Sequence, residues 1–126
     1  MKDAQILVVE DNERNMKLFC DLLQASGYRT LEATTGESAV ALAIDHRPDL
    51  VLMDIQLPDI DGVEALGRLR ADERSASLPV LALTAQAMEG DRERFLAAGF
   101  DGYLSKPVDI AEFVATVKRY CEDGNR

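Results

Sequence analysis

Residues 50–54 read LVLMD, four apolar residues in a row followed by an aspartate. An uninterrupted apolar run is typical of a strand buried on both faces of a parallel sheet. Similar runs occupy residues 4–9 and 80–83, and residues 29–33 and 102–104 are weaker candidates. The LVLMD stretch therefore predicts one of five strands, with an acidic group where that strand ends.

Helical patterns separate these runs. Apolar residues recur at helical spacing in five segments, which are 16–23, 36–46, 62–71, 89–98 and 110–121. Regular alternation of strand and helix implies right-handed crossovers and a parallel sheet covered on both faces. We therefore expect an α/β fold with a doubly wound sheet, in which residues 1–126 form one domain with a core at about residues 4–122.

Composition narrows the class of protein. The 126 residues include 14 Lys and Arg against 23 Asp and Glu, a net charge of -9, and most of this excess is typical of a solvated surface. That sign argues against nucleic-acid binding. No stretch approaches the roughly 20 apolar residues of a membrane span, and no signal peptide is evident. Cys20 and Cys121 are too few for a disulfide framework, so we expect a cytoplasmic protein without a membrane partner.

Polar residues follow four of the five predicted strands. In an open parallel sheet, ligands bind beyond the carboxyl ends of the strands. The residues at those ends are Glu10, Asp11 and Asn12 after the first strand, Asp54 after the third, Thr84 after the fourth, and Ser105 and Lys106 after the fifth. We expect three carboxylates, a hydroxyl and an ammonium to meet at one edge.

This set of groups suits phosphoryl transfer. Neighbouring carboxylates raise one another's pKa unless a cation lies among them, and carboxylate oxygens are ligands for Mg²⁺. Lys106 and Thr84 provide partners for phosphoryl oxygens. Asp54 is the natural nucleophile, because carboxylates form aspartyl phosphates.

Each residue also has a purely structural interpretation. Residues 10–12 are typical of the cap and first turn of a helix, an aspartate after a strand often forms a turn, and Lys106 with Pro107 fits an ordinary loop. The functional interpretation gains weight from position, since the polar residues fall at the ends of different strands.

Four motifs resemble a known family. They are VEDN at 9–12, LMDIQLP at 52–58, LTA at 83–85 and YLSKP at 103–107. Together they are similar to the receiver domain of two-component response regulators, the CheY-like fold, from about residue 5 to the last helix. The resemblance implies the strand order 2-1-3-4-5 with five flanking helices. It extends especially to free-standing single-domain regulators of the cell cycle, and receivers fused to hybrid histidine kinases are similar in the same stretches.

The resemblance implies a role for each site residue. Asp54 would be the phosphoacceptor, and Asp11, Asp54 and the backbone carbonyl of Gln56 would ligate Mg²⁺, with Glu10 holding the ion through water. Thr84 and Lys106 would bind phosphoryl oxygens. The peptide bond between Lys106 and Pro107 is usually cis in the family. Tyr103 would be the switch aromatic, although a half-buried strand tyrosine fits the same position.

The resemblance also implies partners. A histidine kinase or histidine phosphotransferase would dock near the first helix, and a downstream protein would bind the face of the fourth helix, the last strand and the last helix. Residues expected on that face are Glu89, Asp91, Arg92, Asp101, Tyr103 and Glu112. Such a chain is a signalling switch rather than an enzyme.

Two other classes share parts of this pattern. A haloacid-dehalogenase-like phosphatase would also use Asp54, but it needs a second aspartate where this chain has Gln56. A flavin-binding domain of the same topology would need a hydroxyl- and glycine-rich loop after the first strand, where this chain is acidic.

Overall fold

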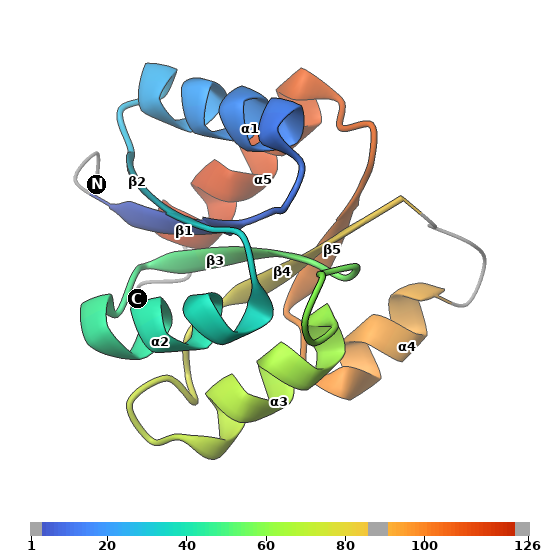
Figure 1. Ribbon diagram of the computed structural model, residues 1–126. Helices are drawn as coiled ribbons and strands as arrows, with labels where there is room; N and C mark the ends of the chain where they lie inside the picture. The colour runs from blue at the N-terminus through green and yellow to red at the C-terminus, as the bar shows by residue number, and fades with distance from the viewer. Residues whose placement is uncertain (1–3, 86–90, 123–126) are drawn as a thin grey trace.

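The computed structural model describes residues 4–85 and 91–122, which alternate strand and helix five times (Figure 1). The strands are β1 (Gln5–Val9), β2 (Arg29–Ala33), β3 (Leu50–Asp54), β4 (Val80–Thr84) and β5 (Gly102–Ser105). The helices are α1 (Glu13–Ala25), α2 (Gly36–His46), α3 (Gly62–Ala71), α4 (Asp91–Ala98) and α5 (Ile110–Glu122). Each expected element is present. Glu89, expected at the start of the fourth helix, lies outside the described residues.

The five strands form one parallel sheet in the order β2-β1-β3-β4-β5. This confirms the doubly wound topology. Helices α1 and α5 cover one face of the sheet, and α2, α3 and α4 cover the other (Figure 1). The strand order changes direction between β1 and β3. The helices that follow these two strands, α1 and α3, therefore cover opposite faces of the sheet, which leaves room for a site between the carboxyl ends of β1 and β3.

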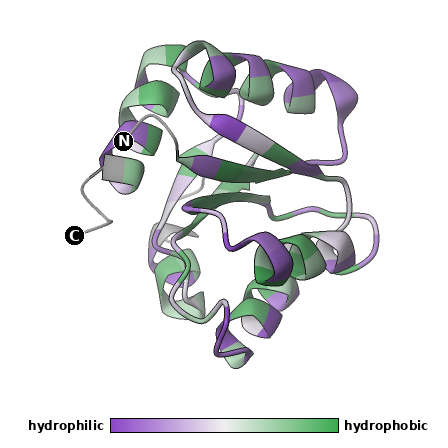
Figure 2. Cartoon of the chain, turned by 90° about the vertical axis from the view of Figure 1, so that its left-hand side faces the viewer, coloured by the Kyte–Doolittle hydropathy of each residue, from purple (hydrophilic) through white to green (hydrophobic). Residues whose placement is uncertain are grey.

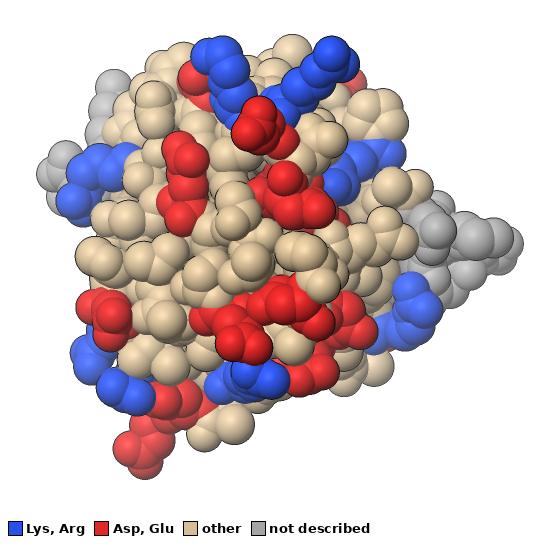
Figure 3. Space-filling view, in the orientation of Figure 1, with Lys and Arg blue, Asp and Glu red and all other residues tan. Residues whose placement is uncertain are grey.

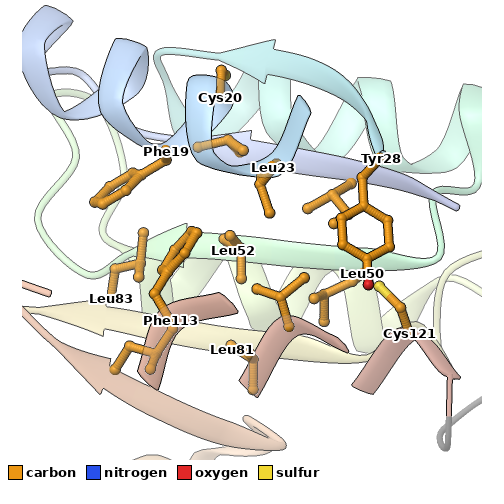
Figure 4. Packing of buried hydrophobic residues seen from close by; sticks show 14 of the residues in the cluster. Phe19, Cys20, Leu23, Tyr28, Leu50, Leu52, Leu81, Leu83, Phe113 and Cys121 are labelled. Atoms are coloured by element: carbon orange, nitrogen blue, oxygen red, sulfur yellow. The ribbon is translucent and has the colours of Figure 1, made fainter. Parts of the chain in front are cut away.

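Each face of the sheet has its own core. Alternate residues of β1 point to opposite faces: Ile6 and Val8 pack with α1 and α5, while Leu7 and Val9 pack with α2, α3 and α4. In the first core, Phe19 of α1 stacks on Phe113 of α5 with ring centroids 5.3 Å apart (Figure 4). In Figure 2, hydrophobic residues lie in the central strands and on the sides of the helices that face the sheet, whereas β2 at the edge of the sheet also carries hydrophilic residues. Burial on both faces explains why β3 and β4 are apolar up to their last residues, Asp54 and Thr84.

Short polar side chains begin the helices that follow the strand ends. Asn12 accepts from the Asn15 N–H, Thr35 from Ser38, Asp61 from Glu64, and Asp109 from Glu112. These bonds satisfy N–H groups of the first turn. The capping interpretation of residues 10–12 is therefore correct for Asn12, which leaves Glu10 and Asp11 available for other contacts.

Both cysteines are buried and neither forms a disulfide, as expected for core residues. Burial raises the pKa of the Cys20 thiol to about 11, so this thiol stays protonated at neutral pH. Within residues 4–85 and 91–122, no helix is both long and apolar enough to cross a bilayer.

Candidate functional site

Three carboxylates meet at the carboxyl ends of β1 and β3. Glu10 and Asp11 follow β1, and Asp54 is the last residue of β3. One carboxylate oxygen from each lies within 4.8 Å of the others. Glu10 and Asp54 are 1% and 4% exposed, whereas Asp11 faces solvent. The convergence expected from the sequence is therefore present, with two acids inside the protein and one at its surface.

Lys106, which follows β5, reaches across to this cluster. Its Nζ donates to Glu10 Oε1 at 2.9 Å and to Asp54 Oδ2 at 3.1 Å. Its backbone N–H donates to the Thr84 carbonyl at 2.7 Å, which ties the loop after β5 to the end of β4. The peptide bond between Lys106 and Pro107 is cis. One ammonium group thus links the ends of three different strands.

Burial controls the electrostatics of the cluster. Desolvation raises the pKa of Glu10, and the charge of Asp54 adds to this, while bonds from Lys106 and from the Asn12 N–H oppose it. Burial alone would lower the pKa of Lys106, but Glu10 and Asp54 raise it overall. Lys106 therefore stays charged at neutral pH, and the cluster keeps more negative than positive charge.

The donor set fits a hard divalent cation. All three side chains offer oxygen ligands, which Mg²⁺ prefers, and the excess negative charge gives an ion an electrostatic reason to bind. Both Glu10 oxygens already accept hydrogen bonds, from Lys106 and from the Asn12 N–H. The exposed carboxylate of Asp11 is open to solvent and hence to a hydrated ion.

Asp54 also lines a small cavity. Its volume is about 40 Å³. Its lining residues are Asp54, Ile55, Gln56, Thr84, Ala85, Arg94 and Lys106. Thr84 is only 5% exposed, so its hydroxyl group belongs to the interior of the site. A larger groove of about 490 Å³ between α1 and β2 reaches Glu10 and Asp11 but is not lined by Asp54.

The loop between β3 and α3 is held close to Asp54. The Gln56 N–H donates to Asp54 Oδ1 at 3.0 Å, and the Gly62 N–H donates to the Ile55 carbonyl at 2.8 Å. A Cβ atom on Gly62 would lie 2.5 Å from the Asp54 carbonyl oxygen, so the backbone approach depends on glycine. Asp59 extends from this loop to the start of α2 and accepts from the N–H groups of Gly36 and Glu37.

Comparison with known proteins identifies the family. The model of the response regulator receiver domain matches residues 6–118. The chain belongs to the response-regulator receiver family. This receiver is 49% identical over 118 residues to the polar-differentiation response regulator DivK of Brucella anthropi, and the match covers 94% of this chain and 96% of the relative. DivK of Brucella melitensis matches to the same extent.

Solved structures agree with this assignment. The receiver domain of the sensor histidine kinase PA1611 of Pseudomonas aeruginosa, described with a magnesium ion in its active-site cleft, is 40% identical with a TM-score of 0.87. The chemotaxis regulator CheY4 of Vibrio cholerae is 27% identical, also with a TM-score of 0.87. Both matches cover 94% of this chain and 98% of the solved chain. The receiver identity and the CheY-like fold are therefore confirmed.

The structure gathers most residues predicted for the site of this receiver. Glu10, Asp11, Asp54 and Lys106 lie together, and Thr84 lines the cavity beside Asp54. Sequence reasoning missed a further lining residue, the arginine at position 94 of α4. No motif contains it, and its spacing from the other site residues carries no signal without the three-dimensional fold.

Tyr103 lies on β5 away from the acidic cluster. It is half-buried and packs against Phe95 of α4 with ring centroids 6.1 Å apart. A second groove, of about 160 Å³, lies between β5, α4 and α5 and is lined in part by Tyr103 and Glu112. Asp101 and Glu112 are exposed, and the side chains of Asp91 and Arg92 lie outside the described part of the chain.

Proposed function

We propose that this receiver accepts a phosphoryl group on Asp54 from the phosphohistidine of a kinase or phosphotransferase, and that Mg²⁺ assists. The observation that carries the proposal is the position of the Asp54 carboxylate. It belongs to an acidic cluster and also lines a cavity that Thr84, Arg94 and Lys106 line as well. Phosphoryl transfer needs this combination of positioned nucleophile and charge neutralisation.

Asp11 and Asp54 are the proposed direct ligands of the ion, together with the backbone carbonyl of Gln56, and Glu10 would contact it through water. The oxygen-only donor set and the paired oxygens of Glu10 support this arrangement. The magnesium ion described in the PA1611 receiver supports it as well. Bound Mg²⁺ would neutralise charge on the oxygens of the transferring group.

In the proposed transfer, an Asp54 carboxylate oxygen forms a bond to phosphorus while the phosphorus–nitrogen bond of the donor breaks. The histidine ring retains the electron pair of that bond. The Lys106 ammonium already lies 3.1 Å from Asp54 Oδ2 and would bind a phosphoryl oxygen as negative charge builds up there. The Thr84 hydroxyl would donate to another oxygen in the cavity.

The acyl phosphate would then bias an equilibrium between two conformations of the receiver. We propose that Thr84 moves toward the phosphoryl group and that Tyr103 turns inward. Contact between Tyr103 and Phe95 supports a link from β5 to α4. A downstream protein would recognise the face formed by α4, β5 and α5, which presents Tyr103 beside exposed Asp101 and Glu112.

The phosphodonor would dock beside α1. Arg14 and Pro107 are exposed there, and Leu18 leaves 40% of its side chain exposed although it is apolar. Asp and Glu side chains gather over the middle of the face shown in Figure 3. A surface of this sign favours protein partners over nucleic acid.

We further propose a free-standing cytoplasmic regulator of the DivK type that acts in cell-cycle control, because the similarity covers 96% of the DivK sequence. The likeness to the receiver of a sensor histidine kinase favours a second candidate, a module of a hybrid kinase. An immunoblot of the source cells separates the two, because a free-standing regulator gives a band near 13.9 kDa and a hybrid kinase gives a much larger one.

We propose no turnover on phosphate esters, since Gln56 stands where an aspartate-dependent phosphatase needs a second acid. Steady hydrolysis of a generic phosphate ester that is lost in Asp54→Asn would favour the phosphatase instead.

The direct test is labelling with acetyl phosphate and Mg²⁺, read on a phosphate-affinity gel. The wild-type chain should be labelled, Asp54→Asn should not, and labelling should stop when EDTA removes the metal. Asp21→Asn, on the exposed side of α1, is the matched control and should label normally. Normal labelling of Asp54→Asn would refute the assignment of the phosphoacceptor.

A further inference from the structure

The cavity beside Asp54 is the space in which a phosphoryl group on that residue would lie. About 10–15 Å³ of such space holds one water molecule, so 40 Å³ is enough for a group of several heavy atoms. The carboxylate is held in position at both oxygens, by Lys106 at Oδ2 and by the Gln56 N–H at Oδ1. Whatever bonds to Asp54 therefore projects from a carboxylate of fixed orientation.

The charges around this cavity are unequal. Asp54 belongs to the acidic cluster with Glu10 and Asp11, but neither Glu10 nor Asp11 lines the cavity. Among the described lining residues, two are cations and one is an acid. Lys106 divides its charge between Asp54 and Glu10. Arg94 contributes a second positive charge to the lining of the cavity.

Phosphorylation changes this balance sharply. A phosphoryl group adds a charge of about -1.5 to -2 at neutral pH, together with three acceptor oxygens. Lys106 alone cannot neutralise such a group while it also pairs with Glu10. A guanidinium group has five N–H donors in a planar fork and binds phosphate oxygens in pairs, so Arg94 has the chemistry that the cavity would then require.

Resting on the function proposed above, we propose that the Arg94 guanidinium binds the phosphoryl group carried by Asp54, as a second cation beside Lys106. The side chain is solvent-exposed and lines the cavity beside Asp54. Its guanidinium carbon lies 5.0 Å from the Phe95 ring centroid, and Phe95 in turn packs against Tyr103. Binding at Arg94 would thus act directly on α4, the helix next to the switch tyrosine.

The experiment uses beryllofluoride, a phosphoryl mimic, with Mg²⁺ and the full chain, followed by fluorine NMR. The half-saturating concentration is measured for wild type, Arg94→Lys, Arg94→Ala and Arg94→Glu. Arg68→Ala is the matched control, because Arg68 is also an exposed helical arginine, paired with Glu64, and does not line the cavity. We expect Arg94→Ala to need about tenfold more beryllofluoride, the loss of one charge-assisted hydrogen bond.

The order of the variants separates direct binding from a structural role. Binding should weaken from wild type to Lys, then Ala, then Glu, while Arg68→Ala matches wild type. Equal losses in all three Arg94 variants, or no loss in any of them, would overturn the proposal while leaving phosphorylation at Asp54 intact. If the wild-type chain itself shows no Asp54-dependent binding, the proposed function fails first and this inference fails with it.

Discussion

Lys106 shows how one residue can hold together a site built of mutually repelling groups. Its ammonium contacts Glu10 and Asp54, which are almost completely buried and would otherwise face each other without a counter-ion. Buried carboxylates without a cation are costly, and the raised pKa of Glu10 reflects part of that cost even with Lys106 present. The same residue that would bind a phosphoryl oxygen therefore also stabilises the unphosphorylated protein.

We expect Lys106→Met to lower the free energy of unfolding by roughly 2–4 kcal/mol at pH 7 without metal, because two buried carboxylates lose their cation. The folded-state pKa of Glu10 is raised, so Glu10 takes up a proton as pH falls and then needs no cation. The loss should therefore shrink on going from pH 7 to about pH 4. Urea denaturation at both pH values measures it.

Lys17→Met is the control, since Lys17 pairs with Asp21 across an exposed helix surface where ion pairs contribute little. A loss for Lys106→Met that is as small as the control, or one that grows at low pH, would contradict this account.

At the scale of an element, the β3–α3 loop and the start of α3 hold Asp54 in position. Gly62, the first residue of α3, allows the helix to start directly against the backbone of Asp54, and Asp59 joins the loop to the start of α2. The loop is therefore anchored at its own helix and at a neighbouring one. This double attachment supports Asp54, which ends β3, and Gln56, which lies within the loop.

Gly62→Ala should destabilise the protein by about 1–3 kcal/mol, because its Cβ would meet backbone atoms of Asp54 and Ile55 that cannot rotate away. Gly67→Ala on the same helix is the control. Its Cβ would meet nothing within 4 Å, so it should stabilise by about 0.5–1 kcal/mol through helix propensity. Thermal unfolding of both variants tests this contrast, and equal effects at the two positions would refute it.

Asp59→Asn should weaken the attachment of the loop to α2 in a pH-dependent way. Hydrogen bonds from the backbone N–H groups of Glu37 and Gly36 lower the pKa of Asp59 to about 2. A lowered carboxyl pKa stabilises the fold above the unfolded value near 4 and stops doing so as pH falls toward 2. The variant should therefore be less stable than wild type at pH 7 but nearly equal to it near pH 2. A difference that persists at low pH would show that charge is not the cause.

At the scale of the whole molecule, aromatic rings in contact lead from α4, whose Arg94 lines the cavity beside Asp54, to β5. The ring centroid of Phe95 lies 6.0 Å from that of Phe100 and 6.1 Å from that of Tyr103. Phe95 directly follows Arg94, which lines the cavity beside Asp54. The Tyr120 hydroxyl of α5 donates to the Asp101 carbonyl at 2.8 Å, which ties α5 to the start of β5. Changes at Asp54 thus have a packed route to the α4–β5–α5 face.

We expect beryllofluoride to change hydrogen exchange in β5 and α5 of the wild-type chain but not of Asp54→Asn. In Tyr103→Ala, binding at Asp54 should persist while the change in β5 and α5 is lost, because the ring that transmits it is absent. An unchanged far-face response in Tyr103→Ala would remove Tyr103 from the switch. Hydrogen-exchange mass spectrometry gives both readouts.

The strands, the helices and the edge that carries the site could be predicted from the sequence, because short-range patterns of apolar and polar residues determine them. Uninterrupted apolar runs such as 50–53 predict strands buried on both faces, and helical periodicity predicts the elements between them. Acidic and basic residues directly after those runs then predict the edge at which they meet, since parallel strands bring their carboxyl ends together. These patterns by themselves place Glu10, Asp54 and Lys106 at one edge of the sheet.

The remaining features are contacts between residues far apart in the chain, and local sequence patterns do not predict which of these residues meet. Only the packed structure shows Lys106 shared between Glu10 and Asp54, and only it brings the arginine of α4 to the cavity wall. The link from Asp59 to the N-terminus of α2 is likewise a contact between residues 23 positions apart in the chain. Local order follows from side-chain pattern along the chain, whereas these contacts follow from how two helical layers close over one sheet.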